Sequence, residues 1–253
     1  MSSMMCGMLL GAGVVSKKTY VDDVFATTLW EGDGSNSRTI TTNIDTATDG
    51  GLIWIKNRDN SSYWNVLFDS VRGGSQLSSN RSDAALAQAS NVAGYVSNYS
   101  TTGFTLTSGS SSNDTGNKDD QDNIGYSFKK TPKFFDIVTY TGNGSNRTIA
   151  HSLETVPGMM IIKCTSEARD WAVYHRDLKG TTGNENNAGT AIIFLNTTEG
   201  RSHNDEYWNN TAPTSTHFSV GTQNGTNKNG ATYVAYLFGG GGEQPSNITN
   251  SVS

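Results

Sequence analysis

The sequence predicts an all-β fold in which two tandem antiparallel β-sandwich units follow one another along the chain. One observation is an internal repeat, and another is a series of short apolar segments separated by turn-forming residues. The third is composition, because 28 glycines and abundant Asn, Ser and Thr suit short strands joined by many turns. A single larger jelly roll built from both halves is the alternative architecture.

The repeat is clearest in the stretch WEGDGSNSRTI at 30–40, which returns as YTGNGSNRTI at 140–149. In both copies an aromatic residue is followed by Gly-Asx-Gly-Ser-Asn and then by Arg-Thr-Ile. Downstream, GLIWIK at 51–56 matches GMMIIK at 158–163. The order of these matches is kept, so the chain is a tandem duplication of a unit of roughly 110 residues, a common domain size.

Two further matches make the duplication testable. Trp64 aligns with Trp171, and Tyr126 aligns with Tyr236. We expect each pair to superpose, because both copies must fill the same core position.

The chain divides into four segments. We expect an apolar N-terminal arm at 1–19, unit one at 20–130, unit two at 134–238 and a flexible hinge and tail at 239–253.

The expected elements alternate with polar turns throughout. In unit one, apolar runs and period-2 alternation predict strands at 24–30, 52–56, 63–68, 95–99, 104–107 and 124–128, with a short strand ending near residue 44. A helical turn is expected at 82–89 and a polar surface loop at 109–123. In unit two, strands are expected at 135–140, 159–163, 171–175, 191–196, 218–221 and 231–238. We expect these two small sandwiches to pack side by side.

Charge and cysteine content exclude several classes of protein. The net charge is −5 and no basic face can be recognised, which argues against nucleic-acid binding. The two cysteines, Cys6 and Cys164, have no partner at ligand spacing, so neither a disulfide framework nor a zinc site is predicted. The apolar run at the N-terminus is too short to span a bilayer, and its charges follow it, unlike those of a signal peptide. No cofactor is expected.

The sequence predicts no enzyme. The four histidines fall on different elements, and no Gly-x-Ser-x-Gly elbow occurs. Glycoside hydrolysis needs two carboxylates across a cleft, and the candidates all lie on or near polar loops: Asp170, Asp177, Glu185, Asp205 and Glu206. The loop 113–122 is rich in oxygen donors but misses the EF-hand spacing, so a solvated loop is favoured over a calcium site.

One aromatic pair is the candidate ligand platform. Tyr207 and Trp208 have no counterpart in unit one and lie beside a polar loop that includes Asp205. A glycan could stack on such a pair while the carboxylate binds its hydroxyl groups. We therefore name Tyr207, Trp208 and Asp205 as the candidate glycan-binding residues and predict no metal ligand.

The N-terminal arm is the candidate assembly element. Two small sandwiches have little room to bury its apolar side chains, so we expect it to pack on a partner. The residues concerned are Met4, Met5, Met8, Leu9, Leu10, Val14 and Val15.

The sequence also resembles a known family. The runs YTGNGSNRTIAHSLETVPGMMIIK, WAVYH, WNNTAPTSTHFSVG and TYVAYLFGG in unit two, with GLIWIKNRD in unit one, resemble a repeat in structural proteins of marine bacteriophages. Those tail-fibre or virion proteins often carry the repeat beside concanavalin A-like lectin domains. The resemblance spans roughly residues 20–240.

The resemblance implies a lectin-like sandwich in a non-enzymatic virion protein, in the tail rather than the head. It further implies assembly and host attachment as roles, other virion proteins and a host surface glycan as partners, and a homotrimer. The alternatives are a head decoration or head-fibre protein, or a glycan-binding lectin or depolymerase module. It supplies no catalytic residues.

Overall fold

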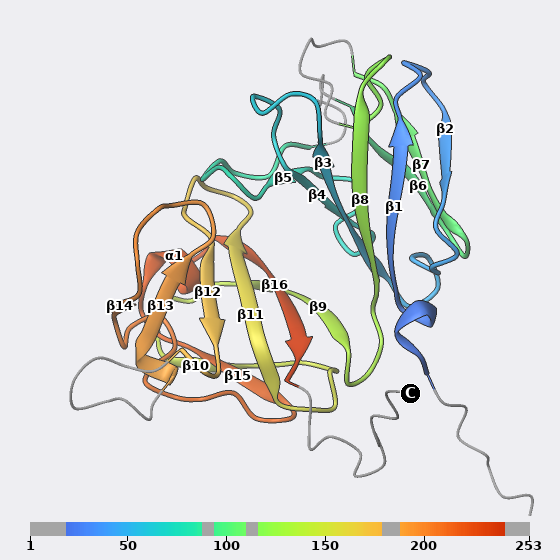
Figure 1. The fold of residues 1–253 in the computed structure, drawn as a ribbon. Coiled ribbons are helices and arrows are strands. Elements are labelled where there is room, and N and C mark those ends of the chain that lie inside the picture. The colour runs from blue at the N-terminus through green and yellow to red at the C-terminus, as the bar shows by residue number, and fades with distance from the viewer. Residues whose placement is uncertain (1–18, 88–93, 110–115, 179–187, 241–253) are drawn as a thin grey trace, which may run out of the picture.

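A computed structural model describes residues 19–87, 94–109, 116–178 and 188–240 of the chain (Figure 1). This part is built almost entirely from antiparallel strands, which confirms the predicted all-β sandwich fold. The candidate assembly residues Met4, Met5, Met8, Leu9, Leu10, Val14 and Val15 lie outside the described residues.

Unit one contains two sheets. The larger has the strand order β1-β8-β3-β4-β5 and the smaller has the order β2-β7-β6. After a 3-10 turn, η1 (Val21–Asp23), the strands are β1 (Phe25–Glu31), β2 (Arg38–Thr41), β3 (Gly51–Asn57), β4 (Val66–Asp69), β5 (Leu77–Ser78), β6 (Tyr95–Ser100), β7 (Gly103–Thr107) and β8 (Asp122–Lys129).

Unit two repeats this arrangement. Its larger sheet has the order β14-β13-β12-β11-β16-β9, and β10 pairs with β15 in the smaller sheet. The strands are β9 (Phe135–Thr141), β10 (Arg147–Ala150), β11 (Pro157–Cys164), β12 (Ala172–His175), β13 (Ala191–Phe194), β14 (Ser202–His203), β15 (His217–Val220) and β16 (Thr232–Gly239), with the short helices η3 (Ala188–Thr190) and α1 (Asn224–Asn227).

Strand register tests the predicted equivalences. Tyr126 pairs with Trp54 of β3, and Tyr236 pairs with Ile161 of β11, so the match of Tyr126 with Tyr236 is confirmed. The match of Trp64 with Trp171 is wrong. Ile55 pairs with Val66 in unit one, whereas its counterpart Ile162 pairs with Ala172 in unit two.

That register makes Asn65 the counterpart of Trp171. The two tryptophans therefore point to opposite faces of their sheets, because successive side chains in a strand alternate. Trp64 packs against the inner core of unit one and lies under the Arg81 guanidinium, 4.5 Å from the ring centroid. Trp171 is fully buried and packs with residues of both units.

Each unit has its own core between its two sheets. The unit-one core includes Ile53, Ile55, Phe68 and Phe104. The unit-two core includes Ile162, Tyr174, Trp208 and Phe218. In the larger sheets, the core side chains of β3, β4, β11 and β12 alternate with a second apolar set that faces the other unit.

The two units meet through the outer faces of their larger sheets. One apolar cluster joins Leu52 and Leu67 of unit one to Ile161, Val173 and Val234 of unit two. The larger sheets of the two units therefore pack against each other across a shared core. Strands β3, β11, β12 and β16 carry apolar side chains on both faces, because one face lines the core of its own unit and the other lines this shared cluster.

A buried polar group lies at this junction. Arg72 Nε donates to Asp69 Oδ2 at 2.6 Å, and Arg72 Nη2 donates to Tyr236 Oη at 3.2 Å. Tyr236 Oη in turn donates to Asp69 Oδ2 at 2.7 Å. Burial raises the pKa of Tyr236 well above its usual value, so its hydroxyl stays protonated and serves as a donor across the unit boundary.

The predicted helical turn at 82–89 is wrong for its described residues, 82–87. This segment is extended: Gln76 and Leu86 form a β-bridge, and Ala85 N donates to Thr165 O at 2.8 Å. Contact with unit two outweighs the helical preference of its alanines, since tertiary packing readily overrides weak propensity. The segment thus crosses from unit one onto the larger sheet of unit two.

A single amide holds the repeated turn in unit one. Asn117 Nδ2 donates to Asp33 Oδ1 and to Ser35 O, both at 2.9 Å, and Gly34 N donates to Asn117 O at 2.9 Å. The aromatic residue before the turn adds a bond, from Trp30 Nε1 to Gly116 O at 2.8 Å. We call this arrangement the asparagine clasp.

Unit two builds the same clasp with Asn227. Its Nδ2 donates to Asn143 Oδ1 at 3.2 Å and to Ser145 O at 2.7 Å, and Gly144 N donates to Asn227 O at 2.7 Å. Tyr140 Oη donates to Thr226 O at 2.6 Å, in place of the tryptophan of unit one. Both clasp asparagines are buried, so their bonds are shielded from water.

The clasp also explains the first glycine of the repeated turn. A Cβ at Gly32 would lie 1.9 Å from Lys118 O, and one at Gly142 would lie 2.2 Å from Lys228 O. Only glycine lets the two backbones approach this closely.

Replacing Asn227 with Ala should lower the free energy of unfolding by about 1–3 kcal/mol, because buried groups of the turn lose their partner. Denaturant titration followed by tryptophan fluorescence measures the change. Asn229→Ala, at an exposed position two residues further on, is the matched control and should change stability little. Equal unfolding midpoints for the two variants would refute the role of the clasp.

Candidate functional site

A polar pocket of about 300 Å³ lies beside Tyr207. Four segments meet there: the β11–β12 loop, the segment before β15, the start of α1, and the crossing segment of unit one. They contribute Ser82, Ala168, Arg169, Asp170, Tyr207, Gln223, Asn224 and Gly225. We call this the Tyr207 pocket.

The aromatic wall of the pocket is fixed by packing. The Tyr207 ring is half-buried and meets Phe194 edge-on, with centroids 5.8 Å apart. The ring also lies against Gly225, where a Cβ would lie 2.9 Å from Tyr207 Cε1. Glycine at this position therefore lets the ring lie against the backbone. Burial raises the pKa of Tyr207, which keeps the hydroxyl protonated at neutral pH.

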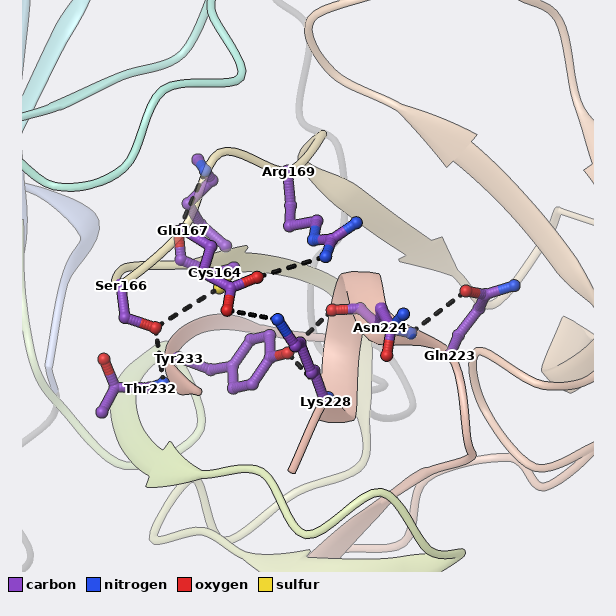
Figure 2. A network of polar contacts seen from close by, with 10 residues as sticks. Cys164, Ser166, Glu167, Arg169, Gln223, Asn224, Lys228, Thr232 and Tyr233 are labelled. Atoms are coloured by element: carbon purple, nitrogen blue, oxygen red, sulfur yellow. Dashed lines mark hydrogen bonds and ion pairs between the residues drawn. The ribbon is translucent and has the colours of Figure 1, made fainter. Parts of the chain in front are cut away.

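Charged groups flank the pocket on the side of the β11–β12 loop. Glu167 forms ion pairs with both Lys228 and Arg169, the latter at 3.1 Å (Figure 2). Hydrogen bonds from Lys228 and Arg169 lower the pKa of Glu167, so the carboxylate is charged at neutral pH. Arg169 N also donates to Ser82 O at 2.8 Å, which ties the pocket to unit one.

Asp170 is oriented by an amide. Asn196 Nδ2 donates to Asp170 Oδ1 at 2.8 Å, while Asn196 Oδ1 accepts from Trp171 N at 2.9 Å. The bonds fix one carboxylate oxygen of Asp170 at the pocket wall. Asp170 itself is exposed, so its other oxygen can accept hydrogen bonds from a ligand.

Hydrogen bonds from Tyr233 and Gln223 hold α1 in place at the pocket wall. Tyr233 Oη donates to Asn224 O at 2.7 Å and accepts from Lys228 N at 2.8 Å (Figure 2). Gln223 Oε1 accepts from Asn224 N at 3.1 Å, and Gln223 Nε2 donates to Glu206 Oε2 at 3.1 Å. These bonds fix the backbone of α1 and leave the Asn224 side chain at the pocket wall.

The structure separates the three predicted glycan-binding residues. Only Tyr207 lines the pocket. Trp208 is completely buried in the unit-two core, where Nε1 donates to Ala191 O at 3.0 Å, so the prediction of a stacking surface is wrong for this residue. Asp205 is exposed and lines a neighbouring pocket of about 320 Å³ together with Glu206 and Asn209.

Sequence reasoning missed most of the pocket. The sequence singles out Asp170 only as a possible glycosidase carboxylate, and Arg169, Gln223 and Asn224 belong to no motif. One sequence signal could have drawn attention to the α1 region. The run TNK at 226–228 repeats the GNK at 116–118, which places both clasp asparagines at equivalent positions.

A second, larger pocket of about 520 Å³ lies at the junction of the units. Among the described residues, it is lined mainly by hydroxyl groups and aromatic rings, with Arg72 as the one charged residue: Val71, Arg72, Ser75, Ala85, Thr139, Tyr140, Thr141, Thr165, Thr232 and Tyr233. The Tyr207 pocket combines an aromatic face with acidic, basic and amide side chains, so it offers the richer set of ligand contacts.

The described residues hold no group of three or more His, Cys, Asp or Glu side chains placed to bind a metal ion. Within the same residues, no helix has the length and apolarity needed to cross a bilayer. What the Tyr207 pocket offers chemically is a ring face for stacking and fixed hydrogen-bonding groups of both kinds.

The fold and pocket define a duplicated all-β sandwich protein with a polar cleft on its second unit. The chain belongs to the family described as a domain of unknown function, DUF7483, whose profile matches residues 21–241. The match runs through both units. Neither the curated proteins nor the solved structures contain a match to the chain.

Lys163 contacts the backbone of Ser82, a lining residue of the pocket, and has a shifted pKa. It is fully buried, and its Nζ donates to Ser82 O at 3.0 Å and to Cys164 O at 2.9 Å. Burial lowers the pKa of Lys163 from 10.5 to about 8. Its counterpart in unit one, Lys56, is exposed.

The buried amine should make stability depend on alkaline pH. Between about pH 8 and 10.5 the unfolded chain holds the Lys163 proton more tightly than the folded chain does. The folded state therefore gains stability as pH rises through this window. Relative to Lys163→Met, the wild type should gain on the order of 1–3 kcal/mol.

Urea titrations at intervals from pH 7.5 to about 10.5 measure this difference. Lys56→Met is the matched control, because it removes the equivalent but exposed lysine and should leave the pH trend of the wild type in place. A constant difference between wild type and Lys163→Met would contradict the burial of a titrating amine.

Proposed function

We propose that this chain is a non-enzymatic structural protein of a bacteriophage particle, namely a tail fibre or tail-associated component. Support comes first from the resemblance of residues 20–240 to repeats in virion proteins. The observation that carries the proposal structurally is the apolar cluster shared by both units. Such a junction holds the two units in one fixed arrangement, which suits a structural component of a particle.

The proposed role has two parts. In assembly, the chain contacts other virion proteins and further copies of itself, for which the resemblance implies a trimer. In host attachment, it presents a binding surface to a glycan of the host. The Tyr207 pocket suits the second part, since pyranose rings stack on aromatic faces and their hydroxyl groups pair with carboxylate, amide and guanidinium groups.

Immunogold electron microscopy of purified phage particles tests the location. Antibodies against residues 20–240, raised on the recombinant chain, should label the tail. Labelling of the capsid would instead favour a head decoration or head-fibre protein. Particles that carry no label, although the same antibodies detect the chain in infected cells, would refute a virion role.

A glycan array tests the pocket. If it binds glycan, Tyr207→Ala should reduce binding at least tenfold, a loss of about 1.4 kcal/mol or more. Gly225→Ala should act in the same direction, because the new Cβ displaces the Tyr207 ring. Asp205→Asn is the matched control in the neighbouring pocket and should leave binding unchanged.

Two outcomes would change the assignment. Binding lost in Asp205→Asn and kept in Tyr207→Ala would move the glycan site to the Asp205 pocket. Release of reducing sugars from host polysaccharide by the purified chain would overturn the non-enzymatic assignment and favour a depolymerase.

A further inference from the structure

The two units differ at one edge of their larger sheets. In unit one the edge strand is β1, and in unit two it is the equivalent strand β9. Each pairs with a single neighbour, β8 or β16. Since the two strands descend from the same repeat, each serves as a control for the other.

Backbone direction alternates along both edge strands. Val24 O accepts from Lys129 N, and Gly32 N donates to Gln121 O, so the even-numbered residues of β1 face β8. The odd-numbered residues therefore direct their N–H and C=O groups to the outer edge. They are Phe25, Thr27, Leu29 and Glu31.

The outer edge of β9 is protected. Phe135 exchanges two backbone hydrogen bonds with Thr131, each at about the ideal length: 3.1 and 2.9 Å. The next outward group, Ile137 N, donates to the side chain of Asp136 at 2.9 Å. Asp136 is buried and also pairs with Lys130 at 3.1 Å. An inward-pointing charge and a local bridge are devices that block strand addition.

The outer edge of β1 has none of these devices. Ala26 stands where unit two has Asp136, so no side chain caps the neighbouring N–H. Among the described residues, no hydrogen bond reaches the outward backbone groups of Phe25, Thr27, Leu29 or Glu31. The strand contains no proline or lysine and pairs with β8 over seven consecutive residues without a bulge. Such an edge is a template for another strand.

The side chains beside this edge are apolar and exposed. Leu29 is 60% exposed, and its cross-strand neighbour Ile124 is only partly buried. The counterparts in unit two are Thr139 and Val234, of which Val234 is fully buried beneath unit one. Leu29 and Ile124 thus form an exposed apolar surface on unit one. It lies on the same face of the larger sheet as the residues that contact unit two.

We infer that β1 pairs with β1 of a second copy of this chain, antiparallel across a two-fold axis at Leu29. This register brings the exposed Leu29 side chains together and places Thr27 opposite Glu31 of the other copy. No acidic residue of β1 then faces another, which matters because like charges directly opposite destabilise a sheet. The two larger sheets join into one continuous sheet. Any other occupant would need an unpaired strand of its own, whereas a copy supplies β1.

This contact is two-fold, so it differs from the trimer implied by the resemblance. It is independent of the proposed host attachment, since the Tyr207 pocket does not enter the argument, and a mass of two chains would argue against the proposed trimer.

The test uses the full chain in solution. Multi-angle light scattering should give a mass of two chains for the wild type at high concentration. Leu29→Lys should give one chain, because lysine on an edge strand blocks pairing. Thr139→Lys, at the equivalent exposed position of β9, should keep the mass of two chains. Circular dichroism should show both variants folded.

Cross-linking tests the register. In a Cys6→Ser background, Leu29→Cys should form an intermolecular disulfide on mild oxidation, because opposed residues in such a pair lie about 5.5 Å apart at Cα. Thr139→Cys in the same background should not. A monomer at all concentrations without cross-linking, a trimer, or a two-chain mass unchanged by Leu29→Lys would each overturn the inference. A monomer would mean that the outer edge of β1 contacts solvent or residues 1–18 and not a second copy.

Discussion

The asparagine clasp is the constraint on which both units depend. One buried amide holds a Gly-Asx-Gly-Ser turn against the loop that precedes the last strand, in unit one through Asn117 and in unit two through Asn227. The turn carries the chain from the larger sheet to the smaller one. Fixing it therefore fixes how the two sheets of each sandwich face each other, whatever residues fill the core between them.

The clasp also explains why the turn is the best-preserved part of the repeat. Its geometry relies on backbone groups and on one side chain that can both donate and accept, a combination that few residues provide. Core positions are less restrictive, because apolar side chains of similar volume can replace one another. Trp54 and Ile161 occupy equivalent positions in the two units, and so do Trp30 and Tyr140.

Sequence patterns sufficed for the all-β class, the duplication and the Tyr126–Tyr236 equivalence. They were insufficient for Trp64, because a tryptophan present in both copies of the repeat need not occupy the same position in the strand pairing. From the shared lysine, Lys56 or Lys163, the next strand begins one residue later in unit one than in unit two. A shift of one residue moves a side chain to the other face of the sheet. Trp64 therefore packs on the core of unit one, whereas Trp171 packs in the cluster shared by the two units.

The Tyr207 pocket could not be predicted because it is assembled from distant parts of the chain. Ser82 comes from unit one, and its position depends on an extended segment that local sequence favours as helix. Tyr207 and Trp208 are neighbours outside any strand, and burial of one ring in the core directs the other toward the surface. The residues next to Ser82 and Tyr207 in the sequence do not determine which segment Ser82 contacts or which way the Tyr207 ring points.

The clasp has a consequence for synthesis on the ribosome. In each unit its two partners are separated by 84 residues, so the first turn must wait for nearly the whole unit to emerge before its bonds can form. Contacts this distant in sequence make folding slow. Unit one can close on itself while unit two is still being translated, but its outer apolar face stays uncovered until the second sheet is complete. The nascent chain therefore passes through a stage that invites association with other chains, and chaperones would act at that stage.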